Sequence, residues 1–450
     1  MKKSSLLLLL SISLLILSSC RREEDLPEPL DRDLELAMFK ASGGIGKQYF
    51  LMPSSGDFTA IPQDPKNPLT AAKVKLGKLL FHETALSLNP KTPGGLLTYS
   101  CASCHHARAG FQSGTAQGLG DGGSGFGIRG EARRVSVDCP ADSCDFQQLK
   151  SPSAMNIAYQ TNVLWNGQFG ATHINTGTQG SWTPGTPKEM NNLGYQGVET
   201  QAIAGQSVHR LKLDTAFLSN NPVYRALFDE AFADLPQNDR ITTINAGLAI
   251  AAYERTLLSN QAPFQRYLQG NPDVMSDDEK KGAILFFGKA ECYKCHSGPA
   301  LNSMQFFALG FNDMKTGNPG VASADPNKPD HLGRGSFTGN ANDMYKFKVP
   351  QLYNLKDAGF FGHGGTFRSV KEVVEYKNAG ISQNPKVPVA RLAYEFKPLN
   401  LSDEEVNQLV KFIEVGLYDP SLNRYVPSTI PSGQCFPNND AQSKADMGCH

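Results

Sequence analysis

The chain has 450 residues and no formal net charge at neutral pH, because 43 lysine and arginine side chains balance 43 aspartate and glutamate side chains. This length is sufficient for two or more domains, each with its own hydrophobic core. The balanced charge gives no reason to expect a nucleic-acid partner, so that class of function is set aside.

The N-terminal segment MKKSSLLLLLSISLLILSSC has the features of an export signal. Lys2 and Lys3 give it a basic start, a leucine-rich run follows, and small residues precede Cys20. The run is too short to read comfortably as a transmembrane helix. LSSC resembles a bacterial lipobox, which implies that residues 1–19 are removed and that Cys20 is acylated; the alternative is an ordinary signal peptide with an incidental cysteine.

We therefore expect an exported protein on the periplasmic side, held by lipid to a bacterial membrane whose identity the sequence leaves open. Residues 20–55 are predicted to form the lipid anchor and a tether, because this stretch is charged and then rich in glycine.

Two segments of the chain share one plan. In the first, LTAAKVKLGKLLF at 69–81 predicts an amphipathic helix and CASCH follows at 101–105. A closing helix is predicted near 242–258, with Ile244, Leu248 and Leu257 on its apolar face.

The second copy begins with SDDEKKGAILFFG at 276–288, where Ser276 and Glu279 form a predicted capping box. CYKCH follows at 292–296, and a closing helix with a second capping box, from Ser402 to Glu405, is predicted at 402–417.

The repeat predicts a mainly α fold with two cytochrome c-like domains and long loops between the helices. We place the domains at 56–270 and 271–430, with the boundary in NPDVM at 271–275, and a C-terminal tail at 431–450.

The C-x-x-C-H pattern suits covalent haem attachment, because two thiols can add to the two vinyl groups while the next imidazole coordinates the iron. Cys101 and Cys104 would hold one haem, and Cys292 and Cys295 the other. A single zinc site would need four neighbouring ligands, but the pairs are far apart in the chain and each has its own flanking helices. A thioredoxin-like redox pair would need a βαβ context, which is missing.

Four further cysteines remain once Cys20 and the two C-x-x-C-H units are set aside: Cys139, Cys144, Cys435 and Cys449. In an exported chain they suggest two disulfides. Three pairings are formally open, and we favour the local one, in which each bond closes the shortest loop.

Over roughly residues 60–420 the sequence resembles the bacterial di-haem cytochrome c peroxidases and the related MauG enzymes. The segments that carry the resemblance are LGKLLFHETALS before SCASCH, SPSAMNIAYQTNVLWNGQF at 151–169, AAYERTLLS at 251–259 and FKVPQLYNLKDAGFFGHGG at 347–365. Any one of these segments would be a weak match by itself, but the four together are specific to this family.

The resemblance implies that His105 and His296 are proximal iron ligands. It also implies that one haem has an open face where peroxide is split while the other stores and relays an electron. Trp165 matches a tryptophan between the haems, although a core aromatic is the alternative. Asn156 matches a position that contributes to a calcium site, and His363 is expected near the second haem.

The sequence departs from the family where a glutamate is expected to move a proton between the peroxide oxygens. The corresponding run is AGQSVHR at 204–210, and His209 is the best substitute. Gln201, two residues after Glu199, is a candidate hydrogen-bond donor. The alternative role for His209 is a bond to a haem propionate or to the backbone.

Many members of the family carry a distal histidine on the first haem. Here no histidine follows His106 in the loop after the first motif, and His106 itself is next to the proximal ligand and is not expected to reach the opposite haem face. By this resemblance the first haem is predicted to be five-coordinate at rest. For the second haem, the family places a methionine or a tyrosine fourteen residues after the position of His363, which here is Lys377. We favour the neighbouring Tyr376, with Lys377, Met344 or no protein ligand as alternatives.

Together these features predict a peroxidase that reduces hydrogen peroxide with electrons from a small cytochrome c or cupredoxin. It would carry two covalent haems and one calcium ion, and a homodimer is left open. The rival functions are MauG-like oxidation of a protein side chain and non-enzymatic electron transfer.

Overall fold

The computed structural model describes residues 28–140 and 143–449. The expected signal peptide and the acylated Cys20 lie outside the described residues. No helix within the described ranges combines the length and the apolar character that crossing a bilayer requires.

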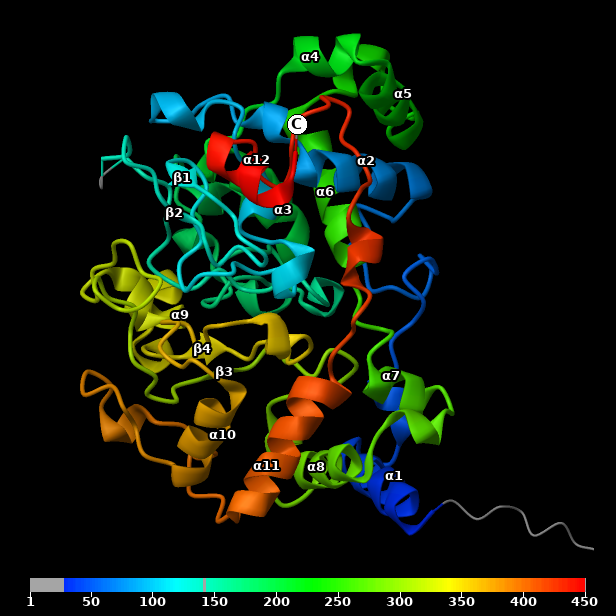
Figure 1. The fold of residues 1–450 in the computed structure, drawn as a ribbon, viewed down its shortest axis with the longest axis vertical. Helices are drawn as coiled ribbons and strands as arrows, with labels where there is room; N and C mark the ends of the chain where they lie inside the picture. The colour runs from blue at the N-terminus through cyan, green and yellow to red at the C-terminus, as the bar shows by residue number, and fades with distance from the viewer. Residues whose placement is uncertain (1–27, 141–142, 450) are drawn as a thin grey trace, which may run out of the picture.

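The fold is mainly α, as predicted (Figure 1). Its helices are α1 (Pro29–Ala41), α2 (Ala71–His82), α3 (Gly197–Val208), α4 (Thr215–Asn220), α5 (Pro222–Ala231), α6 (Thr243–Arg255), α7 (Pro263–Leu268), α8 (Asp277–Phe287), α9 (Arg334–Thr338), α10 (Val370–Ala379), α11 (Asp403–Lys411) and α12 (Ala441–Met447). Two short antiparallel pairs join β1 (Gly123–Ser124) to β2 (Arg134–Val135) and β3 (Phe306–Phe307) to β4 (Phe347–Lys348).

The predicted repeat is present as two helix pairs. In the N-terminal half α2 packs on α6, and in the C-terminal half α8 packs on α11. Each crossing depends on a glycine: a Cβ at Gly77 would lie 1.8 Å from Ala249 O, and one at Gly282 would lie 2.0 Å from Gln408 O. The two opening helices therefore approach their partners backbone to backbone in the same way.

Local sequence signals account for the helix starts. Both predicted capping boxes, at Ser276 and Ser402, are formed. Helix α6 is buried from Asn245 to Arg255, but Ile244 in its first turn is 40% exposed, so the prediction that Ile244 faces the core is wrong.

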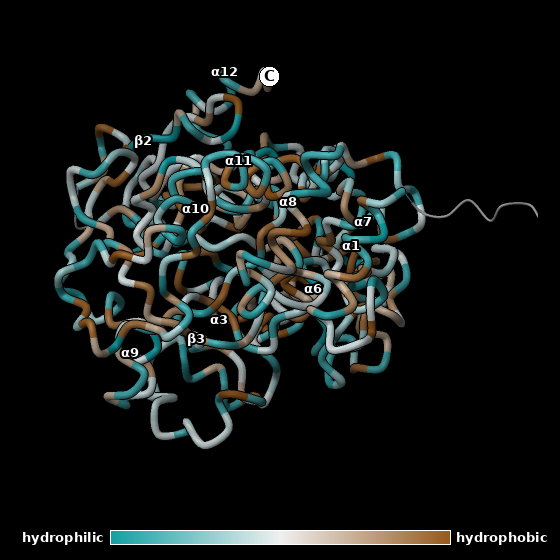
Figure 2. The backbone as a smooth tube through the Cα atoms, turned by 90° about the horizontal axis from the view of Figure 1, so that it is seen from below, coloured by the Kyte–Doolittle hydropathy of each residue, from teal (hydrophilic) through white to brown (hydrophobic). Residues whose placement is uncertain are grey.

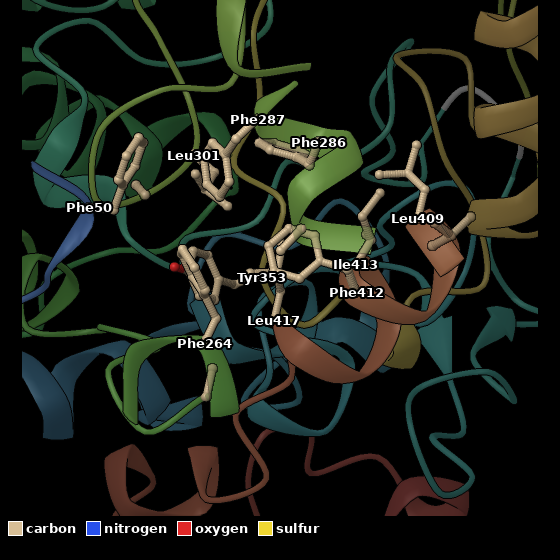
Figure 3. Packing of buried hydrophobic residues seen from close by; sticks show 14 of the residues in the cluster. Phe50, Phe264, Phe286, Phe287, Leu301, Tyr353, Leu409, Phe412, Ile413 and Leu417 are labelled. Carbon is tan, nitrogen blue, oxygen red and sulfur yellow. The ribbon is translucent and has the colours of Figure 1, made fainter. Parts of the chain in front are cut away.

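An aromatic cluster forms the core of the C-terminal half (Figure 3). Phe286 and Phe287 of α8 contact Phe412 with ring centroids 5.5 and 6.3 Å apart, and Phe264 contacts the same ring at 5.3 Å. Figure 2 shows hydrophobic segments gathered around α6, α3 and α8 and hydrophilic loops at the periphery. Burial of this apolar surface holds the helix pairs together.

The first and last described helices, α1 and α12, pack on the halves opposite to their places in the sequence. Leu34 and Met38 of α1 are fully buried in the C-terminal core, and Asp31 pairs with Lys280 of α8 at 2.7 Å. The prediction of a tether is therefore wrong for residues 29–50, because α1 has an apolar face that α8 covers.

The C-terminal tail returns to the N-terminal half. Tyr425 is part of the N-terminal core, and α12 lies beside β1 and β2, where Asp440 pairs with Arg133 at 3.3 Å (Figure 1). The segment around α7, which sequence analysis assigned to the N-terminal domain, packs into the C-terminal core through Phe264, Tyr267 and Leu268. The domain boundary at 271–275 stays a prediction.

Both local disulfides are formed, Cys139 with Cys144 and Cys435 with Cys449, and the predicted pairing is confirmed. The second bond closes the loop that carries α12.

Candidate active site

Each C-x-x-C-H unit folds as one tight turn after its opening helix. In the first, the His105 amide donates to Cys101 O at 3.2 Å, and in the second the His296 amide donates to Cys292 O at 2.9 Å. The four cysteines of these units are free thiols, whereas the other cysteines of the described chain are paired. The turns therefore present two thiols and an imidazole together.

Hydrogen bonds orient both imidazoles in the same way. His105 Nδ1 lies 3.2 Å from Phe111 O, and His296 Nδ1 lies 3.0 Å from Leu301 O and 3.1 Å from Pro350 O. A carbonyl only accepts, so each Nδ1 carries the proton and each Nε2 keeps a free lone pair for a metal ion.

Burial lowers the pKa of His105 and that of His296 to about 4, so both rings are neutral at physiological pH. A neutral imidazole is the form that ligates iron.

One cavity of about 550 Å³ reaches both turns. Its wall includes the thiols and imidazoles of the two units, Cys101, Cys104, His105, Cys292, Cys295 and His296. Free thiols, Nε2 lone pairs and a continuous, largely apolar wall fit two covalently attached haems.

Comparison with known proteins gives the same result. The sequence profile described as di-haem cytochrome c peroxidase matches residues 71–273. The cytochrome-c peroxidase IdrP1 of Denitromonas iodatirespirans is 30% identical over 398 residues, a match that covers 83% of this chain and 88% of that protein. The chain belongs to the di-haem cytochrome c peroxidase family.

Other relatives of this chain are MauG proteins. MauG of Methylorubrum extorquens is 29% identical over 364 residues, covering 80% of this chain and 83% of that protein. A MauG-like protein associated with microbial copper homeostasis shares the fold, with a TM-score of 0.57, 23% identity, and coverage of 84% of this chain and 96% of that chain. The diheme peroxidase BthA from Burkholderia thailandensis has a TM-score of 0.50, 19% identity, and coverage of 85% and 93%. The family therefore includes more than one activity.

His209 ends α3 on the wall of the cavity, with Gln201 two turns earlier on the same helix. His209 Nδ1 lies 2.9 Å from Asp145 Oδ2, and the side chains are 37% and 7% exposed. Burial alone would lower the pKa of His209, but the Asp145 carboxylate outweighs it and raises the pKa above its usual value. The pair leaves Nε2 of His209 for contact with a bound molecule.

Sequence reasoning missed Asp145, whose place beside His209 follows from the folding of a distant loop. It also missed Glu254 of α6, which lines the cavity and whose pKa burial raises to about 8. By contrast, Glu199 pairs with Arg255 at 2.6 Å, fully buried, and serves to hold α3 on α6.

Trp165 lies on the cavity wall where the two halves meet. Its Nε1 donates to Lys150 O at 2.8 Å, and its carbonyl accepts from the Lys348 amide at 2.8 Å. Both lysine side chains are buried and reach glutamines, Lys150 Nζ to Gln112 and Lys348 Nζ to Gln160. Burial lowers the pKa of each lysine to about 7.

Of the candidates for the second haem, Lys377 faces the cavity and Tyr376 does not. The Tyr376 hydroxyl donates to Leu309 O at 2.5 Å, and its ring packs between Phe311 and Phe396 at 5.1 Å from each. Lys377 lines the cavity, and burial lowers its pKa. The Tyr376 ring is therefore turned by α10 toward its own core and away from the cavity, and its role as a ligand stays a prediction.

Met344 packs against Gly335 and is absent from the described cavity wall, so it is not favoured as a ligand either. His106 is buried beside Phe126, at 4.9 Å between ring centroids, and is likewise absent from that wall. This placement agrees with the expectation that His106 does not reach a haem face.

Asn156 is fully buried at the junction of the halves. Its Oδ1 accepts from the Ser259 amide at 2.9 Å, and its Nδ2 lies 3.3 Å from Ser259 Oγ and 3.3 Å from Gln351 Oε1. The Asn156 amide is thus fully engaged by protein groups, and the calcium ion stays a prediction.

His363 lies on the cavity wall between Trp165 and Phe347, with ring centroids 6.4 and 3.7 Å away. Its Nε2 is 3.3 Å from Asp313 Oδ1, and the same oxygen lies 3.6 Å from His331 Nδ1. Sequence reasoning identified His363 but missed Asp313 and His331.

Proposed function

We propose that the protein reduces hydrogen peroxide to water, taking two electrons one at a time from a small cytochrome c or cupredoxin. The observation that carries this proposal is the Asp145–His209 pair on the wall of the cavity that contains the first C-x-x-C-H turn. In this proposal Cys101 and Cys104 attach one haem with His105 as ligand, and Cys292 and Cys295 attach the other with His296. Bound haem supplies one-electron redox chemistry and an iron position that accepts a peroxide oxygen.

The protein's own contribution is proton movement. His209 Nε2 accepts a proton from one peroxide oxygen and returns it to the other, and Asp145 stabilises the imidazolium in between. Gln201 supplies a hydrogen bond to the bound peroxide. Overall, one peroxide, two electrons and two protons give two waters.

Trp165 is proposed to carry charge between the two halves. Its indole is held by Lys150 O and its backbone by Lys348, so the ring is fixed at the junction. The amines of Lys150 and Lys348 are hydrogen-bond donors on either side of this residue. An anionic haem propionate beside them would favour their protonated form and pair with it.

For the second haem we propose Lys377 as the sixth ligand. The side chain projects from α10 onto the cavity wall, and its lowered pKa favours the neutral amine that can bind iron. The first haem is proposed to be five-coordinate, because His209 is engaged by Asp145 and the Lys150 amine by Gln112.

MauG-like oxidation of a protein side chain is the second candidate function, since MauG proteins are among the relatives. The family resemblance links that activity to a tyrosine ligand, and the hydroxyl of Tyr376 is engaged by Leu309 O. A non-enzymatic electron carrier is the third candidate.

Export, acylation at Cys20, a calcium ion at Asn156 and a homodimer complete the proposal. Labelling with a radioactive fatty acid tests the anchor, and Cys20→Ala should abolish the label. Metal analysis of the haem-loaded protein tests the calcium ion, with Asn156→Ala as the variant that should lose it.

The deciding experiment follows oxidation of a ferrous small cytochrome by the haem-loaded full chain in detergent when peroxide is added without prior reduction. Fast, peroxide-dependent turnover is expected. A long-lived oxidised species without turnover would favour the MauG-like activity, and no reaction would favour the electron carrier.

A further inference from the structure

We propose that Asp313, His331 and His363 bind a divalent transition-metal ion of the zinc or copper class. One ligand atom from each residue lies within 4.8 Å of the other two. Asp313 Oδ1 is 3.3 Å from His363 Nε2 and 3.6 Å from His331 Nδ1. The proposal concerns a site separate from the haem irons and does not depend on peroxidase activity.

The spacing matches coordination by a small cation. Metal–ligand bonds of about 2.0–2.2 Å place tetrahedral ligand atoms roughly 3.3–3.6 Å apart. The two distances from Asp313 Oδ1 fall in that range, and His363 and His331 already aim nitrogen atoms at the same oxygen.

His331 supplies an independent observation. It is only 4% exposed, yet neither ring nitrogen has a hydrogen-bond partner among the described residues. Burying an imidazole nitrogen without a partner costs the desolvation of that group with nothing to offset it. A metal ion bound through Nδ1 would satisfy the ring at the point where it faces Asp313.

The three ligands are held in place by separate parts of the fold. Asp313 follows β3 in a loop, His331 is in the turn Pro329–Leu332, and His363 is clamped on Phe347 at 3.7 Å between ring centroids. Stacking orients His363 Nε2 toward the carboxylate before any ion arrives. A bound ion would therefore connect three loops of the cavity wall.

The donor set selects the class of metal. Two imidazoles and one carboxylate suit zinc, copper or non-haem iron, whereas calcium and magnesium prefer oxygen ligands alone. Three protein ligands also leave a fourth position for water or another small molecule. The proposed ion would lie next to His363, whose ring contacts Trp165 edge to face at 6.4 Å.

Zinc is the probe for the test. The haem-loaded full chain in detergent is treated with a chelator, titrated with Zn²⁺ and passed through gel filtration, and zinc and iron are counted together by elemental analysis. We expect one zinc per two irons. X-ray absorption at the zinc edge should show only nitrogen and oxygen neighbours, with the scattering pattern of two imidazoles.

His331→Gln and Asp313→Asn should each weaken zinc binding by more than about 100-fold, since even changes outside the ligand shell cost about 10- to 100-fold. His173→Gln, which removes an exposed histidine, is the matched control and should bind zinc like the wild type. A haem assay on each variant establishes that two haems are still attached, so that a loss of zinc is not a loss of folding.

Two results would overturn the proposal. One is a wild-type protein with two haems that takes up no stoichiometric zinc, with His331→Gln altering only the haem absorption; His331 would then be a partner of a haem propionate. The other is unchanged zinc binding in both variants while the control behaves as expected.

Discussion

The two C-x-x-C-H regions have the same frame but different walls. In both, an opening helix crosses a closing helix at a glycine, and the histidine Nδ1 donates to backbone carbonyls. Beyond the frame they differ: His209 and Asp145 act on the first region, and Lys377 acts on the second. The two regions thus share one frame, and the proposed roles of splitting peroxide and storing an electron rest on the difference between their walls.

The largest effect should come from removing one haem at a time. Replacing both Cys101 and Cys104 with alanine should leave a single attached haem and reduce peroxide turnover to the background rate, because the proton-moving pair would have no iron to serve. Replacing Cys292 and Cys295 should also leave one haem. Haem staining and an iron count verify the loss. Full turnover by either variant would contradict the proposal that one haem reduces peroxide while the other supplies the stored electron.

The next largest effect should come from His209, which lines the cavity beside the first C-x-x-C-H turn. His209→Ala should lower kcat/KM for peroxide by about 10²- to 10⁴-fold, the usual contribution of a general acid–base group. The absorption of both haems should stay unchanged, since His209 is not a proposed ligand. Unimpaired turnover in this variant, with His173→Gln as the control, would show that another group moves the proton.

Asp145→Asn should lower kcat/KM by about 10- to 100-fold and move its pH dependence. His209 must be neutral to accept a proton, so wild-type activity should fall as the pH drops through its raised pKa. Burial and Arg210 both lower the pKa of His209, and without the Asp145 carboxylate they would act unopposed. The acid limb of the rate profile should therefore shift to lower pH in the variant. A reduced rate with an unshifted limb would assign Asp145 a purely structural role.

The comparison also separates what local sequence can and cannot reveal. Features that depend on residues close together in the sequence were predicted correctly. They are the capping boxes at Ser276 and Ser402, the two thiol pairs and the local disulfides. The pairing of Asp145 with His209 joins a loop to a helix end far along the chain, and no local pattern signals it.

The packing of α1 on α8 was missed for a similar reason. Residues 21–50 are charged and contain glycines, which is typical of a tether, but the apolar face of α1 becomes visible only when α8 is placed against it. At α10 the error was one of helical phase: adjacent residues lie about 100° apart, so Tyr376 and Lys377 face different surroundings. Counting along the sequence reached the right helix without settling which side chain enters the cavity.

The smallest expected effect tests Lys377 as a ligand of the second haem. Lys377→Met should keep both haems and raise the reduction potential of the second haem by on the order of 0.1 V, a fraction of the roughly 0.8 V over which axial ligands tune haem. Tyr376→Phe is the matched control: it removes the hydroxyl that bonds to Leu309 O and leaves the ring in place, so it should cost about 1 kcal/mol of stability and leave the potential unchanged. Spectroelectrochemical titration of both variants measures the shift. If Tyr376→Phe moves the potential and Lys377→Met does not, the amine is not a ligand and the second region would match the tyrosine-ligated members of the family.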